Sequence, residues 1–146
     1  MSSPSENIRL ARIRAGKEPE EVARSAGLNK PTYIFHVEAD DDEVRGNISL
    51  RALKSIARAL GTTPLQILEG ADAVAASSRR SSASVAELVK ARIDAEHLTV
   101  GGYGDRIGWN VSPILDDPER LWDYPFDMLH ALCGELGLDW REIVDA

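Results

Sequence analysis

The chain has 146 residues, of which 43% are hydrophobic and 28% are charged, and its 17 Lys and Arg against 24 Asp and Glu give a net charge of −7. This composition excludes disordered, collagen-like and disulfide-scaffold classes, and the length allows two small domains of about 65 residues each. The single cysteine, Cys133, favours a reducing compartment, and the sequence has no signal peptide and no run of about 18 apolar residues, so we expect a cytoplasmic protein without membrane contact.

The charge is divided unevenly along the chain. Residues 1–70 hold ten basic and ten acidic residues and are neutral, whereas residues 71–146 hold seven basic and fourteen acidic residues and carry the whole net charge of −7. Because DNA is attracted by a local basic surface rather than by the total charge, the acidic total does not exclude DNA binding by the first half.

Residues 1–70 show five short helical segments and no convincing strand. Glycines 16, 27 and 61 end helices, Pro19 stands in a first turn where a missing N–H costs nothing, and Ser49 caps an amphipathic helix. We expect helices over residues 8–15, from 18 to about 26, from 29 to about 39, from 49 to 60, and from 63 to about 68.

The second and third of these segments form the pattern of a helix-turn-helix. Ala23 is small enough for two helices to cross closely, and Gly27 can adopt the left-handed backbone of the turn. The third segment then buries Leu28, Ile34 and Val37. Its opposite side presents side chains that could enter a major groove, namely Lys30, Thr32, Tyr33, Phe35 and His36.

At about residues 6–70 the sequence resembles the Cro/C1-type (XRE-like) helix-turn-helix family of repressors. The resemblance is carried by short matches in the right order, which are Ile8-Arg9-x-Ala11-Arg12, Gly16, Glu20-Glu21-Val22-Ala23, Ala26-Gly27-Leu28, Glu38, and the segment from Ser49 to Gly61. It implies an all-α, five-helix λ-repressor-like domain that reads double-stranded DNA with its third helix.

Carried over by position, the resemblance implies that Asn29, Lys30, Thr32, Tyr33 and His36 face bases or nearby phosphates, and that Arg45 and Asn47 meet the DNA backbone. Phe35 joins this set because an exposed aromatic ring could contact a thymine methyl, or it could pack against the acidic loop that follows. For Arg12, a family arginine, we expect an ion pair within the domain rather than a DNA contact.

Three features depart from the family. Pro19 stands where family members usually have a Gln that contacts a phosphate. The stretch from 27 to 38 is one residue longer than is usual in the family, so Tyr33 lies either in the groove or, if the helix is rotated, in the core. The acidic run 40–43 would be repelled by phosphates. It loops into solvent, discriminates against wrong DNA, or marks a surface that faces a protein.

Residues 71–83 are small and polar and predict a flexible linker that is open to proteases near Arg79 and Arg80. The alternative is that residues 71–76 extend the preceding helix.

Residues 84–146 predict a second helical domain that is a degenerate copy of the first. Residues 91–93 repeat residues 11–13, and 108–110 repeat 27–29 with a shift of one, although chance similarity of amphipathic helices would give such matches too. Capping boxes are expected at Ser84 with Glu87 and at Asp139 with Glu142.

The DNA-reading parts of this second copy have decayed. Glycines 101, 102 and 104 weaken its second helix, although a small residue is expected at Gly104 because this position matches Ala23. Its third helix is interrupted by Pro118 and carries acidic residues. The second domain is rich in aromatic residues, namely Trp109, Trp122, Tyr124, Phe126 and Trp140. We expect most of them in the core and one or two at the surface as interface anchors. We expect a dimerisation or partner-docking domain.

The sequence offers no catalytic or metal-binding constellation. The three histidines are scattered, and His130 with Cys133 provides only two ligands of a metal site, so core packing is expected for Cys133. We therefore expect no enzyme, no cofactor and no metal.

Two functions remain. The first is a sequence-specific DNA-binding transcription regulator, a repressor of phage, prophage or antitoxin type, acting as a homodimer on a near-palindromic operator or as a monomer with both halves on an asymmetric site. The second is a protein-interaction module, antitoxin-like or partner-docking, whose helix-turn-helix no longer binds DNA and whose acidic second domain meets a protein partner.

Overall fold

The computed structural model describes residues 3–146, and every regular element in that range is helical, which confirms the predicted all-α fold. The elements are α1 (Pro4–Ala15), α2 (Pro19–Ser25), α3 (Thr32–Ala39), the π-helical η1 (Glu43–Asn47), α4 (Leu50–Leu60), α5 (Pro64–Glu69), α6 (Ser82–Ala95), α7 (Val100–Ile107), α8 (Ser112–Asp116), the 3₁₀ helix η2 (Pro118–Asp123), α9 (Phe126–Leu136) and the 3₁₀ helix η3 (Trp140–Glu142). None of the helices described is both long and apolar enough to cross a bilayer.

Most helix ends of the first half lie where the sequence predicts them. The side chains of Ser49 and Thr63 accept hydrogen bonds at the N-termini of α4 and α5, and Gly16 and Gly61 end α1 and α4 in the left-handed conformation. Helix α1 begins four residues earlier than expected because the Ser3 hydroxyl accepts the Glu6 N–H and Pro4 occupies the first turn.

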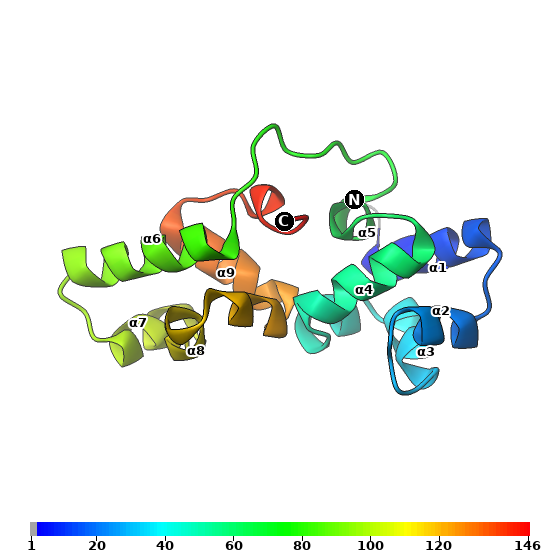
Figure 1. Cartoon of the computed structure of the whole chain (residues 1–146), viewed down its shortest axis with the longest axis horizontal. Coiled ribbons are helices and arrows are strands. Elements are labelled where there is room, and N and C mark those ends of the chain that lie inside the picture. The colour runs from blue at the N-terminus through cyan, green and yellow to red at the C-terminus, as the bar shows by residue number, and fades with distance from the viewer. Residues whose placement is uncertain (1–2) are drawn as a thin grey trace.

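The two halves show the same order of elements, with a short π or 3₁₀ helix before the fourth α-helix in each (Figure 1). They also close the same turn. The Leu28 N–H donates to the Ala23 carbonyl at 2.8 Å, and the Trp109 N–H donates to the Gly104 carbonyl at 3.0 Å. Because Gly27 and Gly108 both have positive φ at these turns, the correspondence supports an internal repeat.

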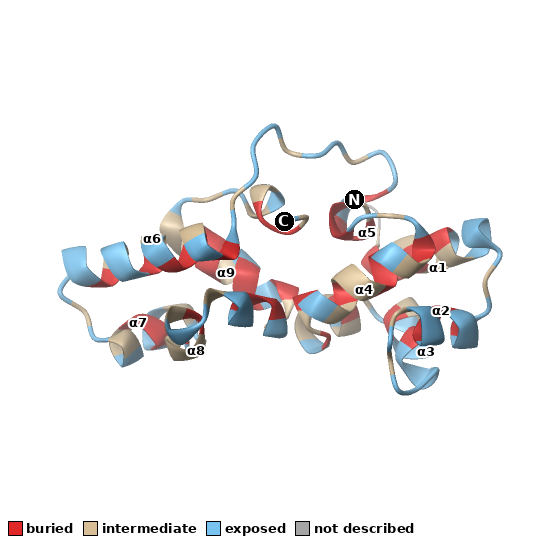
Figure 2. Cartoon of the chain, in the orientation of Figure 1, coloured by how far each residue is buried: buried red, intermediate tan, exposed pale blue. Residues whose placement is uncertain are grey.

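Each half has a set of fully buried apolar side chains on the faces where its helices meet (Figure 2). The first half buries Ile8, Val22, Ile34, Leu53 and Ile56, and the second buries Val85, Val89, Tyr103, Ile114 and Leu129. These residues belong to one cluster that runs through both halves. The hydrophobic contribution to folding is therefore shared across the chain.

The halves meet along a seam that joins α4 to η2 and η1 to α9. The Leu50 N–H donates to the Tyr124 carbonyl at 2.8 Å, and the Lys54 ammonium lies 3.1 Å from the centroid of the Trp122 ring. Burial lowers the pKa of Lys54 to about 8. Of the aromatic residues expected as core or interface anchors, Trp122 and Phe126 are buried and Trp109, Tyr124 and Trp140 are partly buried, so several serve contacts within the chain.

The segment between the halves is attached to the C-terminal end of the described chain. The Arg80 N–H donates to the Glu142 carbonyl at 2.8 Å, and the Ser78 hydroxyl donates to the Glu142 carboxylate at 2.7 Å. The alternative in which residues 71–76 extend a helix is wrong, because α5 ends at Glu69.

Of the two caps predicted in the second half, Ser84 is wrong, and Asp139 is confirmed as a cap but without the capping box. Ser81, not Ser84, caps α6, since its hydroxyl accepts the Ser84 N–H at 3.1 Å and Ser84 lies inside the helix. Asp139 accepts the Arg141 N–H and begins only the single 3₁₀ turn of η3. Glu142 contacts Ser78 instead of completing a capping box.

The close approach of the turn after α7 to Gly104 predicts opposite effects for two glycine substitutions. A Cβ at Gly104 would lie 2.8 Å from the Trp109 carbonyl oxygen, whereas a Cβ at the helical residue Gly134 would meet nothing within 4 Å. We expect Gly104→Ala to lower the free energy of unfolding by ~1–3 kcal/mol through overpacking and Gly134→Ala to raise it by ~0.5–1 kcal/mol through helix propensity. Urea unfolding measures both, and a neutral or stabilising Gly104→Ala would contradict the close approach of the Trp109 carbonyl to Gly104.

Candidate nucleic-acid interface

The turn between α2 and α3 has the geometry that the sequence predicts. Ala23 is 2% exposed, Gly27 has φ +72°, and the Leu28 N–H closes the turn on the Ala23 carbonyl. Ile34 and Val37 are fully buried under α3. The direction of α3 is thus fixed by two buried aliphatic side chains and one short turn.

The opposite side of α3 faces solvent. The predicted contact residues on and just before it, Asn29, Lys30, Thr32, Tyr33, Phe35 and His36, are all exposed. Tyr33 is 44% and Phe35 53% exposed, so the alternative that places Tyr33 in the core is wrong. Two exposed aromatic rings on one short helix are unusual for a surface with no partner.

A bidentate ion pair holds α3 against α1. The Arg12 Nε and Nη2 groups donate to the two carboxylate oxygens of Glu38 at 2.7 and 3.0 Å, and a third N–H donates to the Lys17 carbonyl. The side chains are only 18% and 10% exposed. The predicted role of Arg12 as an ion-pair partner within the domain is confirmed, and the hydrogen bond to Glu38 raises the pKa of its guanidinium.

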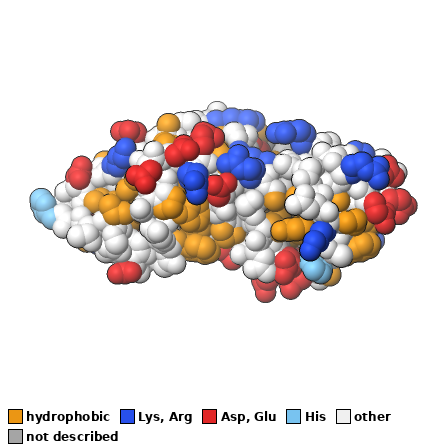
Figure 3. Space-filling view, turned by 60° about the horizontal axis from the view of Figure 1, so that its bottom comes forward, with side chains coloured by type: hydrophobic (Ala, Val, Ile, Leu, Met, Phe, Trp, Pro, Cys, Tyr) orange, Lys and Arg blue, Asp and Glu red, His pale blue; other side chains and the backbone are white. Residues whose placement is uncertain are grey.

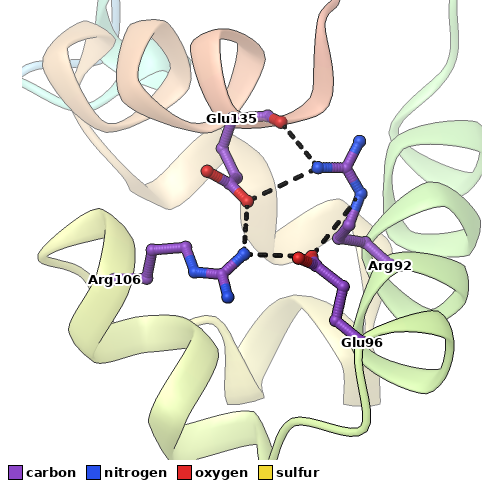
Figure 4. Close-up of polar contacts among 4 residues, drawn as sticks. All are labelled: Arg92, Glu96, Arg106 and Glu135. Carbon is purple, nitrogen blue, oxygen red and sulfur yellow. Dashed lines mark hydrogen bonds and ion pairs between the residues drawn. The ribbon is translucent and has the colours of Figure 1, made fainter.

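The second half uses the arginine at the matching position differently. There Arg92 contacts Glu96 and Glu135, and Arg106 donates to the same two carboxylates at 3.0 and 2.9 Å (Figure 4). This network ties α6 and α7 to α9 rather than to α8. Helix α8 therefore lacks the tether that Arg12 gives to α3.

The acidic run 40–43 is not a uniform negative surface. The Asp41 carboxylate turns back to α1, where it accepts the Ser3 hydroxyl at 2.6 Å and the Ser5 N–H at 2.9 Å. The hydrogen bond from Ser3, followed by that from Ser5, lowers the pKa of Asp41. Glu43 accepts a hydrogen bond from the Asn47 amide at 2.7 Å, which leaves Asp40 and Asp42 as the exposed acids of the run.

Arg45 and Asn47, the two expected backbone contacts, lie in different places. Asn47 is exposed and lines a groove with Asn29 and Tyr33, so the structure brings these three residues together. Arg45 is partly buried, and its side chain lines a separate cavity with Phe126 and Trp140 of the second half.

The groove beside α3 contains residues that the sequence analysis did not assign to the site. Trp109, Asp123 and Pro125 of the second half line it, across from Asn29 and Tyr33. The repeat aligned Trp109 with Leu28, but no local pattern showed that the second half packs beside the turn. The groove is thus shared by both halves.

The molecular edge that carries α3 has mixed charge. Figure 3 brings this edge forward and shows acidic and basic side chains interspersed with hydrophobic and uncharged ones. A basic band across this face would supply strong non-specific DNA binding. Because Figure 3 shows no such basic band on this face, DNA binding by this edge would depend on a few specific contacts.

The remaining chemistry-bearing residues form no metal site in the part of the chain that the structure describes. No group of three or more His, Cys, Asp or Glu side chains is placed to hold a metal ion among residues 3–146. Cys133 is 1% exposed, and burial raises the pKa of its thiol to about 12, which confirms its core position. His130, three residues earlier, is exposed.

Comparison with known proteins gives one informative similarity. The chain is 40% identical over 62 residues to a curated protein of Neisseria meningitidis serogroup B (strain ATCC BAA-335 / MC58) named "Neisseria hypothetical transcription factor". The match covers 42% of this chain and 54% of that protein, so it spans about half of the relative's length. It favours a transcription regulator as the kind of protein. No family model matches, and no solved structure matches.

The inward Asp41 carboxylate predicts a pH-dependent contribution to stability. At about pH 7 we expect Asp41→Asn to lower the free energy of unfolding by ~0.5–1 kcal/mol, because a charged N-terminal cap is lost, whereas its exposed neighbour Asp42→Asn has little effect. The folded pKa of Asp41 is below the ordinary value of 3.8. The stabilisation by its carboxylate is therefore complete above pH 3.8 and is lost as the pH falls from 3.8 through the lower folded pKa. Thermal unfolding from neutral to acid pH measures the difference, and equal effects of the two substitutions would contradict this role.

Proposed function

We propose that this protein is a sequence-specific DNA-binding regulator of transcription that inserts the exposed face of α3 into the major groove. The observation that carries the proposal is the set of solvent-facing side chains on a helix whose other face is fixed by Ile34, Val37 and the Arg12–Glu38 pair. The similarity to a protein named as a hypothetical transcription factor supports the same kind of function.

The chemistry of the α3 face fits groove recognition. Lys30 precedes the first turn and suits a phosphate or a guanine, and Asn29 can donate to a phosphate or pair with an adenine. Thr32 and His36 provide hydrogen-bonding groups on the helix. Tyr33 and Phe35 provide apolar surface for thymine methyl groups, which gives the exposed rings a partner.

The arrangement of the halves favours a monomer on an asymmetric site over a homodimer on a palindrome. Helices α3 and α8 both lie along the lower edge of the molecule in Figure 1, with the seam between them. The aromatic residues Trp122 and Phe126, which a dimer interface would have used, are buried within the chain. Helix α8 carries the exposed acid Asp116, so we assign base reading to α3 alone. Occlusion of promoter DNA would make the protein a repressor.

A second candidate function is a protein-interaction module. The net charge of −7 in residues 71–146 and the lack of a basic band on the edge shown in Figure 3 favour it. In this case the exposed Tyr33 and Phe35 would anchor a protein partner.

Substitutions on α3 separate the two functions. We expect the full chain to bind duplex DNA from upstream of its own gene in the presence of excess random duplex, with an affinity that falls linearly with log salt concentration. Lys30→Ala should weaken binding by about tenfold and reduce the salt slope by about one, and His36→Ala should weaken it for the specific duplex only. Fluorescence anisotropy across a salt series measures both effects.

The matched control is Lys90→Ala, which removes an exposed lysine from α6 of the second half. It should leave affinity and salt slope unchanged. Equal losses for Lys30→Ala and Lys90→Ala would show non-specific attraction only. Binding that is insensitive to Lys30→Ala and His36→Ala would contradict reading by α3 and favour the interaction module.

A further inference from the structure

A cavity of about 430 Å³ lies between the two halves. One side is formed by Arg45 of η1 and Leu68 of α5, and the other by Phe126 and His130 of α9 and Trp140 of η3. In Figure 1, α5 and the C-terminal turn lie at the edge opposite α3. The cavity is therefore separate from the proposed DNA-binding face, and its volume falls in the range of small-molecule sites.

The second-half wall of the cavity is aromatic. The rings of Phe126 and Trp140 meet edge to face with centroids 4.8 Å apart, and the His130 ring lies 5.8 Å from Phe126. Together with Leu68 these side chains offer a surface that suits the face of a planar ring. Phe126 is 7% exposed, so the partly buried Trp140 and the exposed His130 provide most of the aromatic surface that a ligand ring could cover.

The first-half wall contributes a cation whose hydrogen-bonding capacity is incompletely used. The Arg45 Nε is buried and has no hydrogen-bond partner in the described structure. The other two charged residues of the lining, Glu69 and Arg141, form an ion pair with each other across the seam. The lining thus has an excess of one positive charge, and a buried donor without a partner is costly.

We propose that this cavity binds a small aromatic carboxylate, with its ring against Phe126 and Trp140 and its carboxylate on the Arg45 guanidinium. A planar guanidinium can donate to both oxygens of a carboxylate through its terminal Nη groups, which leaves the buried Nε outside the contact. Because the ligand would contact both halves, it would stabilise the seam. Use of this site as an effector site depends on the proposed function, whereas ligand binding itself does not.

The test measures binding of 4-fluorobenzoate to the full chain by ¹⁹F NMR, in the absence of DNA. A probe of about ten heavy atoms should bind saturably with a Kd on the order of 1 mM, and 4-fluorobenzyl alcohol, which has the same ring without the charge, should bind about tenfold more weakly. Arg45→Met should remove this preference, and Trp140→Leu should weaken both probes. Arg58→Met, at an exposed arginine of α4 outside the cavity lining, should change neither.

Several results would overturn the proposal. These are no saturable binding of 4-fluorobenzoate, an unchanged preference for it in Arg45→Met, or an equal loss in Arg58→Met. Because Arg45→Met could also perturb folding, its thermal unfolding is measured alongside, and Arg45→Lys serves as a second variant. Lysine keeps the charge but lacks the planar pair of donors, so binding intermediate between the parent and Arg45→Met is expected. DNA binding plays no part in these measurements, so failure of this site and failure of the proposed function remain distinguishable.

Discussion

The whole structure depends on the packing of the second half onto the first at the N-terminus of α4. The hydrogen bond from the Leu50 N–H to the Tyr124 carbonyl lies at this contact. Lys54 against Trp122 and the Glu69–Arg141 ion pair lie along the same seam. The seam unites two small cores into one cluster, and each core of about 65 residues would be marginal alone. It also creates two concave features, the groove beside α3 and the aromatic cavity at the opposite edge.

Within the first half, charge is used to set the direction of one helix. Glu38 binds Arg12 and thereby fixes the C-terminal part of α3 against α1, and Asp41 caps α1 from the loop that follows α3. Asp41, one of the four acids of the run 40–43, is therefore engaged in the fold. The second half keeps the turn at Gly108 but has lost the equivalent tether, since Arg92 contacts α9 through Glu135. This difference supports the proposal that α3, and not α8, reads DNA.

Local patterns predicted what depends on neighbours in sequence. Ala23 with Gly27, the buried pair Ile34 and Val37, and the cap at Ser49 are all governed by contacts within a few residues, and the structure has them as predicted. The position of Arg45 could not be predicted in this way, because its surroundings come from Phe126 and Trp140, more than 80 residues later in the chain. The sequence did not single out Ser81 as a cap because four further serines, 77, 78, 82 and 84, lie within four residues of it. The start of α6 is fixed by hydrogen bonds from Ser78 and Arg80 to Glu142, far along the chain.

The central claim is that one chain, with its halves packed together, reads an asymmetric DNA site through α3. Selection of bound sequences from a random duplex library by the full chain, followed by sedimentation of the complex with the selected duplex, tests it most directly. The account predicts enrichment of a non-palindromic sequence within one major-groove segment, bound by one chain per duplex. Enrichment of a palindrome bound by two chains would contradict the monomeric arrangement, and the absence of any enriched sequence would contradict DNA reading by this protein.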